Sequence, residues 1–105
     1  MADFMKIMQQ AQQMQARLQQ LQDELASKTV TAASGGGMVT VTADGKGHVR
    51  TIKIDPAIVD PKDVEMLEDL VLVAVGEAQR KAVELAQEEM QGLAGGLPLP
   101  FKMPF

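Results

Sequence analysis

The sequence has no cysteine, tryptophan or tyrosine, and only three phenylalanines among its 105 residues. Without cysteine the chain forms no disulfide, no thiolate metal site and no cysteine nucleophile, which fits a reducing cytoplasm. Because large aromatic side chains are scarce, the core has to come from aliphatic residues and eight methionines. A chain of this size buries only about two-thirds of its unfolded surface. Such modest core residues favour completion of the core by a second copy.

Long apolar runs and targeting signals are also missing. No stretch approaches the roughly 18 apolar residues that a membrane-spanning helix needs. The N-terminal region soon becomes glutamine-rich and has no basic segment followed by an apolar one, as a secretory signal would have. These absences predict a cytoplasmic protein without a membrane partner.

The residue types that carry catalysis or bind metals are scarce. His48 is the only histidine and adjoins a glycine-containing turn, where an exposed turn residue is a simpler interpretation than a zinc ligand or a base. The three glycines at 35–37 precede a strand-like sequence and no Gly-Lys-Ser or Gly-Lys-Thr, so they predict a hairpin rather than a phosphate-binding loop. No serine lies in a Gly-x-Ser-x-Gly elbow. We expect no catalytic residue, no metal site, no cofactor and no small-molecule substrate.

The N-terminal segment is rich in glutamine and carries a regular apolar stripe. Eight glutamines lie between Gln9 and Gln22. The stripe repeats at alternating spacings of three and four residues and consists of Phe4, Ile7, Ala11, Met14, Leu18, Leu21 and Leu25. This spacing predicts a helix over residues 3–26 whose narrow seam packs against a partner helix. We assign five seam residues to a dimer interface: Ile7, Ala11, Met14, Leu18 and Leu21.

The middle of the chain changes from helical spacing to alternation. Apolar residues repeat every second position around residues 30–32, 39–43 and 52–54, which predicts three short strands. The glycines at 35–37 and the Asp-Gly-Lys-Gly turn at 44–47 connect these segments, and Asp-Gly is a strong local hairpin signal. We therefore predict a three-stranded antiparallel meander.

A second helix is predicted from Pro61 to Gly92. Asp60 can cap it, Pro61 suits its first position, and Asp63 can complete a capping box. The prolines in residues 96–105 cannot continue a helix. The predicted domain organisation is a single helix-strand-strand-strand-helix domain over residues 1–93, followed by a Gly/Pro-rich apolar tail over residues 94–105. The fold class is α+β with two layers.

The predicted lengths indicate association. Helices of about 24 and 30 residues reach about 36 and 45 Å, whereas strands of five or six residues extend only about 17 to 20 Å. Both helices therefore overhang the sheet, and a lone chain leaves part of the apolar seam exposed. A homodimer in which the overhangs pack on the partner is the simplest solution. The alternative, a monomer whose first helix folds back on the second, is left open.

Charge is distributed unevenly along the chain. Residues 1–59 carry six basic and five acidic side chains, a balance of +1, whereas residues 60–105 carry four basic and nine acidic ones, a balance of −5. A polyanion should therefore meet the first half. The candidate DNA-binding residues are Lys6, Gln9, Gln13 and Arg17 on the first helix, and Lys46, Arg50 and Lys53 around the hairpin. The simpler interpretation, that glutamine is just a good helix former on a solvated face, is also open.

Specific strings and their order support a family resemblance. The strings are MQQAQQMQ at 8–15, GGMV at 36–39, KIDP at 53–56, MLEDLV at 66–71 and FKMPF at 101–105. The chain resembles the YbaB/EbfC family of small bacterial nucleoid-associated proteins. The resemblance implies an intertwined homodimer with projecting helices that binds double-stranded DNA in the nucleoid, alters its conformation, and influences gene expression and nucleoid organisation. The competing hypothesis is a protein–protein interaction module that uses the Gln-rich helix and the tail without direct DNA contact.

Overall fold

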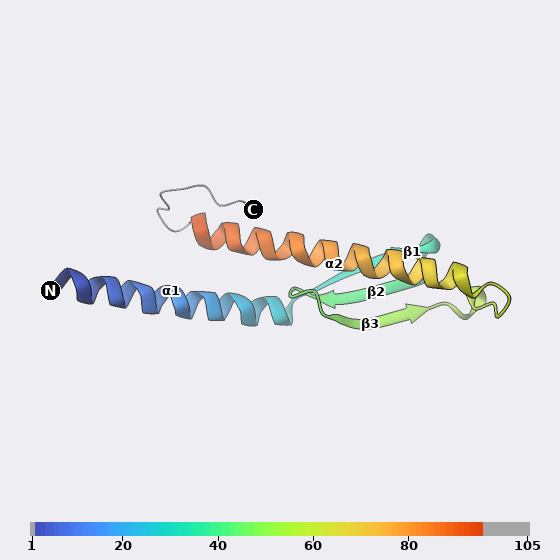
Figure 1. Cartoon of the computed structure of the whole chain (residues 1–105), viewed down its shortest axis with the longest axis horizontal. Coiled ribbons are helices and arrows are strands. Elements are labelled where there is room, and N and C mark those ends of the chain that lie inside the picture. Colours follow the sequence, from blue (N-terminus) through green and yellow to red (C-terminus); the bar gives the residue numbers. More distant parts are fainter. Residues whose placement is uncertain (1, 96–105) are drawn as a thin grey trace.

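The computed structural model describes residues 2–95 (Figure 1). The order of elements is α1 (Ala2–Ser27), β1 (Thr29–Ser34), β2 (Val39–Asp44), β3 (Val49–Ile54) and α2 (Val64–Gly95). Short 3₁₀ turns, η1 (Gly35–Gly37) and η2 (Pro56–Ile58), follow β1 and β3. The molecule is elongated, with extents of 73 × 23 × 16 Å. The predicted α+β order of helix, three strands and helix is confirmed.

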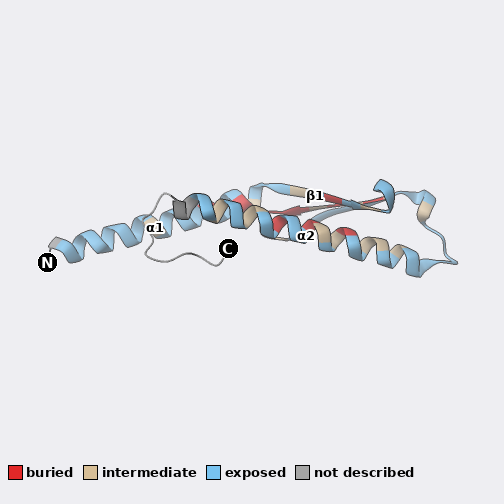
Figure 2. Ribbon diagram, turned by 90° about the horizontal axis from the view of Figure 1, so that it is seen from above, coloured by how far each residue is buried: buried red, intermediate tan, exposed pale blue. Residues whose placement is uncertain are grey.

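The three strands form an antiparallel meander in the order β1-β2-β3. The helix α2 covers one face of this sheet, and the buried residues gather where it meets the strands (Figure 2). The central strand supplies Val39, Val41 and Ala43, all fully buried. On the helix side, Ala74 and Ala78 are fully buried as well. Because alanine is small, the backbone of α2 can approach the sheet closely, and the result is a two-layer core.

The helix α2 begins and ends three residues later than the sequence analysis predicted. Its N-cap is Asp63, whose Oδ1 accepts the N–H of Met66 at 3.2 Å, whereas Asp60 Oδ1 accepts the N–H of Lys62 within the preceding turn. Both aspartates can cap a helix, so the choice depends on where the loop meets the sheet. At the other end, Gly92 costs only about 1 kcal/mol relative to alanine and does not stop the helix. The predicted tail lies largely outside the described residues, which end at Gly95.

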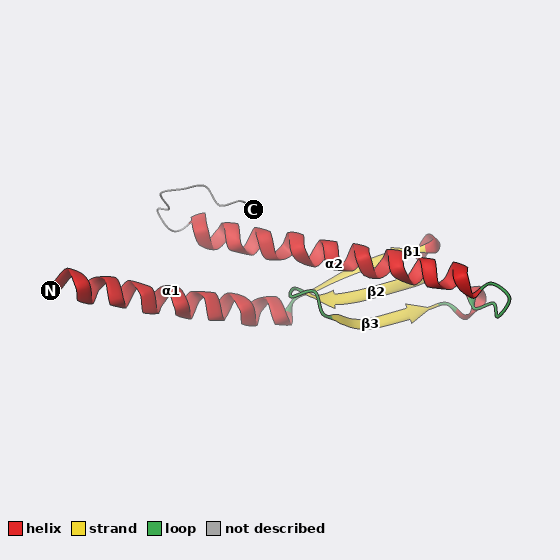
Figure 3. Ribbon diagram, viewed as in Figure 1, coloured by secondary structure: helices red, strands yellow, loops and turns green. Residues whose placement is uncertain are grey.

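The helix α1 projects away from the sheet, as the predicted overhang requires (Figures 1 and 3). Its contacts with α2 and β2 are few, and its buried residues lie near its C-terminal end. Leu21 and Leu25 are buried there, with 8% and 7% of their surface exposed. Toward the N-terminus the seam is uncovered, and Ile7 is 61% exposed. At 26 residues, α1 is about 39 Å long, and residues 3–13 are all exposed in the described structure.

Candidate nucleic-acid interface

Four of the predicted DNA-binding residues lie on α1. Lys6, Gln9, Gln13 and Arg17 are all exposed. Gln13 is seven residues after Lys6 and four before Arg17, so the three side chains share one face of the helix. In the described part of the chain, no carboxylate lies within ion-pair distance of Lys6 or Arg17. This face of α1 can therefore offer both positive charges to an anion.

The β2–β3 turn lies beside the C-terminal end of α1 (Figure 3) and carries a third cation, Lys46. The carboxylate of Asp44 organises the turn, because its Oδ1 accepts the backbone N–H groups of Lys46 at 2.9 Å and His48 at 3.0 Å. Gly47 adopts φ of +88°, which glycine tolerates without strain. The Lys46 side chain projects from this turn and is exposed. The turn therefore adds one positive charge near the base of α1.

Arg50, another predicted DNA-binding residue, is paired with an acid of its own chain. Its Nη2 lies 2.6 Å from Oδ2 of the buried Asp44, and His48 Nδ1 lies 3.6 Å from the same oxygen. Burial alone would raise the pKa of Asp44, but the N–H groups of His48 and Lys46 and the Arg50 guanidinium outweigh it and lower that pKa. Asp44 is thus an anion at neutral pH, and it offsets much of the positive charge of Arg50.

Lys53 lies on the face of the sheet that α2 leaves uncovered. It pairs with Thr40 across β2 and β3, and residues that pair directly project to the same face. Val39 and Val41, the neighbours of Thr40, project to the opposite face, where they are buried under α2. The structure therefore brings Lys46 to the base of α1 but places Lys53 on the outer face of the sheet, toward the far end of β3.

The two basic residues of α2 are both engaged within the chain. The Arg80 guanidinium makes a bidentate contact with Glu77, Nε to Oε1 and Nη2 to Oε2 both at 2.9 Å, and also pairs with Glu84. This contact lowers the pKa of Glu77. Lys81 Nζ donates to the carbonyl oxygen of Thr31 at 2.8 Å. Because α2 has seven acids and two bases, its outward surface is acidic and repels a polyanion.

The predicted dimer seam falls into two parts. Leu21 is buried within its own chain, Met14 is half-buried, and Ile7, Ala11 and Leu18 are exposed. A second apolar surface, which the sequence did not predict, lies uncovered beside α2 in the described structure. Its members are Ile52 and Ile54 on β3 and Leu72 on α2, which are 46%, 37% and 71% exposed. Alternation along β3 was visible in the sequence, but only the structure shows that α2 lies over β1 and β2 and leaves β3 uncovered.

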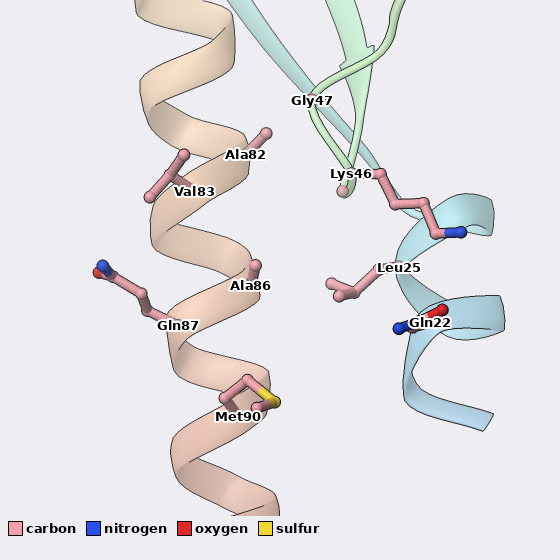
Figure 4. A pocket seen from close by; sticks show the side chains of 10 residues that line it. Gln22, Leu25, Lys46, Gly47, Ala82, Val83, Ala86, Gln87 and Met90 are labelled. Atoms are coloured by element: carbon pink, nitrogen blue, oxygen red, sulfur yellow. The ribbon is translucent and has the colours of Figure 1, made fainter. Parts of the chain in front are cut away.

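A groove of about 590 Å³ separates the end of α1 from α2 (Figure 4). Leu25 points from α1 toward Ala86 and Met90 on α2, and Lys46 lies at the edge of the groove. The lining is mainly apolar, so the groove lacks the convergent polar groups that orient a small-molecule substrate. Within residues 2–95, no cluster of three or more His, Cys, Asp or Glu side chains could hold a metal ion. Neither described helix is long and apolar enough to span a bilayer.

The chain was compared with known protein families and with individual proteins. The model of the YbaB/EbfC DNA-binding family matches residues 1–97. The chain belongs to the YbaB/EbfC family. It is 48% identical to a nucleoid-associated protein of Gemmatimonas aurantiaca, over 98% of this chain and 99% of that protein. It is 46% identical to a nucleoid-associated protein of Rhodospirillum rubrum over the whole of both chains.

A solved structure supports the fold of this YbaB/EbfC member. The crystal structure of an uncharacterized protein from Helicobacter pylori superposes with a TM-score of 0.60 at 25% sequence identity. The match covers 81% of this chain and 94% of that one. The resemblance predicted from the sequence strings is therefore confirmed at the level of family and fold.

Proposed function

We propose that this YbaB/EbfC protein is a nucleoid-associated protein that binds double-stranded DNA as a homodimer, with α1, the β2–β3 turn and β3 supplying the phosphate contacts. Family membership supports DNA binding rather than catalysis, and the names of the relatives support the nucleoid as its location. In such a dimer the α1 helices of the two subunits hold one duplex at separate points and so constrain its path. That constraint is how we expect the protein to alter DNA conformation.

The distribution of unpaired cations carries this proposal. Within the described residues, five basic side chains make no ion pair and no side-chain hydrogen bond: Lys6, Arg17, Lys46, Lys53 and Lys62. The first four lie on α1, the β2–β3 turn and β3, whereas the cations of α2 are engaged by their own chain. Phosphate contacts come mainly from Lys and Arg, and only unpaired cations release counterions at full value. Gln9 and Gln13 flank the α1 cations and can hydrogen-bond to phosphate or base edges.

Uncovered apolar surface supports the homodimer. The α1 seam exposes Ile7, Ala11 and Leu18, and the surface beside α2 exposes Ile52 and Leu72. Contiguous apolar surface of this kind usually marks an interface. A second copy of the same chain can cover both apolar regions, and this explanation requires no other protein. Light scattering at micromolar concentration should report a dimer, and the double variant Ile7→Gln/Leu18→Gln should shift the equilibrium toward monomer.

The salt dependence of DNA binding tests the phosphate contacts. If each subunit neutralises two or three phosphates, the slope of log affinity against log salt is about −4 to −5 on B-DNA. Replacing Lys6, Arg17, Lys46 and Lys53 by Gln should bring the slope close to zero and leave the dimer intact. The matched single variants are Lys46→Gln and Lys62→Gln, because both lysines are exposed and neither makes an ion pair within residues 2–95. Lys62 adjoins the acidic start of α2, so its replacement should leave the slope unchanged. A wild-type slope near zero overturns direct phosphate contact.

The alternative function is a protein–protein interaction module built on the Gln-rich face of α1 and the C-terminal tail. The exposed glutamines of α1 favour it; the tail itself lies outside the described residues. The four-residue Gln variant separates the two functions. Unchanged DNA affinity in that variant, with the dimer intact, would favour the interaction module.

A further inference from the structure

The end of α1 is joined to the β2–β3 turn by backbone atoms. The N–H of Gly45 donates to the carbonyl oxygen of Leu25 at 2.8 Å and to that of Lys28 at 3.0 Å. Gly45 is buried at this contact. Because main-chain atoms make both bonds, the joint does not depend on the rotamer of any side chain. It fixes the last turn of α1 against the sheet.

The joint leaves no room for a side chain. A Cβ atom at Gly45 would lie 2.6 Å from the carbonyl oxygen of Leu25 and 3.0 Å from its Cα. The positive-φ glycines in the described chain are Gly35, Gly36, Gly37 and Gly47. Gly45 is not among them, so close approach rather than backbone conformation is the reason for glycine here. Any larger residue must push α1 and the turn apart.

The turn side of the joint is held rigidly. Asp44 precedes Gly45, and its buried carboxylate accepts the N–H groups of Lys46 and His48. Arg50 Nη2 lies 2.6 Å from the other carboxylate oxygen. The turn is therefore tied to both β2 and β3, whereas residues 3–13 of α1 are all exposed in the described structure. When the contact is widened, α1 is the part that moves.

We propose that Gly45 is a positioning residue that sets the angle at which α1 projects from the sheet. This proposal rests on the proposed function, in which the cations of α1 and Lys46 contact the same duplex. Relieving the contact from 2.6 Å to the 3.4 Å of ordinary contact needs a shift of 0.8 Å. Spread over one helical turn of about 5.4 Å, this shift tilts the helix by about 8°, which moves its N-terminal end by about 5 Å.

Spin labels measure the tilt directly. The chain has no cysteine, so the double substitution Gln10→Cys and Glu88→Cys places one label on exposed α1 and one on exposed α2. Labelled subunits are diluted with unlabelled ones so that distances within one subunit dominate. At Gln10, about 22 Å along the helix from Leu25, the same tilt moves the label by about 3 Å, so Gly45→Ala should shift the distance distribution by up to that amount. Gly76→Ala is the matched control, because a Cβ there meets nothing within 4 Å, and it should shift nothing.

DNA titration separates this inference from the proposed function. Gly45→Ala should weaken binding and flatten the salt slope by about one unit for each phosphate that α1 no longer reaches, while Gly76→Ala keeps the wild-type slope. A shifted distance with unchanged DNA binding supports the joint and contradicts α1 as the DNA surface. An unchanged distance overturns the joint, whatever the DNA result.

If Gly45→Ala does not fold, hydrogen exchange of the Gly45 amide in the unmodified protein tests whether the joint stays closed. A Gly45 N–H bound to two carbonyl groups should exchange as slowly as the amides of the central strand β2. The amide of Lys62, which donates to Asp60 in an exposed turn, is the internal reference for a weakly protected group. A Gly45 amide that exchanges as fast as that of Lys62 shows that the joint opens freely and overturns the proposal.

Discussion

The helices α1 and α2 are comparable in length, at 26 and 32 residues, yet they meet the sheet in opposite ways. The α2 stripe that faces the sheet includes Ala74, Ala78 and Ala82, all buried, and its small side chains let the helix lie flat on β1 and β2. The α1 stripe carries larger residues such as Ile7, which is 61% exposed because none of the described elements covers it. An apolar stripe alone does not predict which surface it packs against. That depends on the size of its side chains and on where the chain places the helix.

The largest expected difference between these regions is in the cost of removing an apolar side chain. Val41 is fully buried under α2, so Val41→Ala should lower the free energy of unfolding by about 2 kcal/mol. Ile7→Ala on the free part of α1 should cost less than about 0.5 kcal/mol in the monomer. Urea denaturation at a concentration where monomer dominates measures both. Equal losses would mean that α1 is packed within its own chain.

A smaller effect is expected for the hydrogen bond that ties α2 to the edge strand. Ser34 Oγ donates to the carbonyl oxygen of Leu70 at 2.6 Å in a partly buried position. Ser34→Ala should cost about 1 kcal/mol, measured by the same denaturation. Ser27 Oγ donates to the carbonyl oxygen of Glu24 on exposed α1, so Ser27→Ala serves as the matched control with a smaller cost. A larger loss of unfolding free energy in Ser27→Ala than in Ser34→Ala would contradict the view that α2 is the more tightly packed helix.

A modest gain in stability is expected on the exposed side of α2. Gly76 lies inside this helix, and an added Cβ meets nothing within 4 Å. Gly76→Ala should raise the free energy of unfolding by about 0.5 to 1 kcal/mol, because alanine restricts the unfolded chain and favours the helix. Thermal unfolding followed by circular dichroism measures the gain. A loss in its place would show that a partner lies against this face of α2 in the assembled protein.

The smallest effect is expected in the pH dependence, which reports on the joint beneath α1. The pKa of Asp44 is lowered in the folded chain from an ordinary value of 3.8. The stability that this carboxylate contributes is therefore fully present above its unfolded pKa and is lost as pH falls through the folded pKa. Asp44→Asn should be less stable at neutral pH and should show a weaker decline below about pH 4. If the free energy of unfolding falls equally with pH in the wild type and in Asp44→Asn, Asp44 does not contribute to the acid sensitivity.

Much of the fold was predictable because its signals are local. The alternation of Val39, Val41 and Ala43 predicted the central strand, and the Asp-Gly turn predicted its connection to β3. The start of α2 was predicted at the wrong aspartate, because Asp60 and Asp63 are both competent caps and the sequence does not show where the loop meets the sheet. The 3₁₀ turn after β3 was not predicted. Asp55 Oδ1 accepts the N–H of Ala57 at its start, and because ordinary turns also begin with such an aspartate, the sequence does not distinguish the two.

The candidate site was less predictable, because charge in the sequence is not the same as available charge. Lys6 and Arg17 could be assigned from the spacing of α1, and neither makes an ion pair with another described residue. Arg50 has the same charge, but its contact with Asp44 depends on how β2 and β3 pair. Leu21 follows the same heptad spacing as Ile7, yet it is buried in its own chain because α2 runs beside the C-terminal half of α1 and does not reach Ile7 (Figure 1). Their roles in DNA contact and dimerisation stay predictions.

Local patterns were enough to predict the order of the elements, the polar and apolar faces of α1 and the acidic character of α2, because periodicity and charge are properties of neighbouring residues. Three features required the folded chain: which cations make no ion pair among the described residues, that α2 leaves β3 uncovered, and that the end of α1 lies against a buried glycine. Those features arise where segments far apart in the chain meet, as the carbonyl of Leu25 meets the N–H of Gly45 at 2.8 Å, and no local pattern records such a meeting.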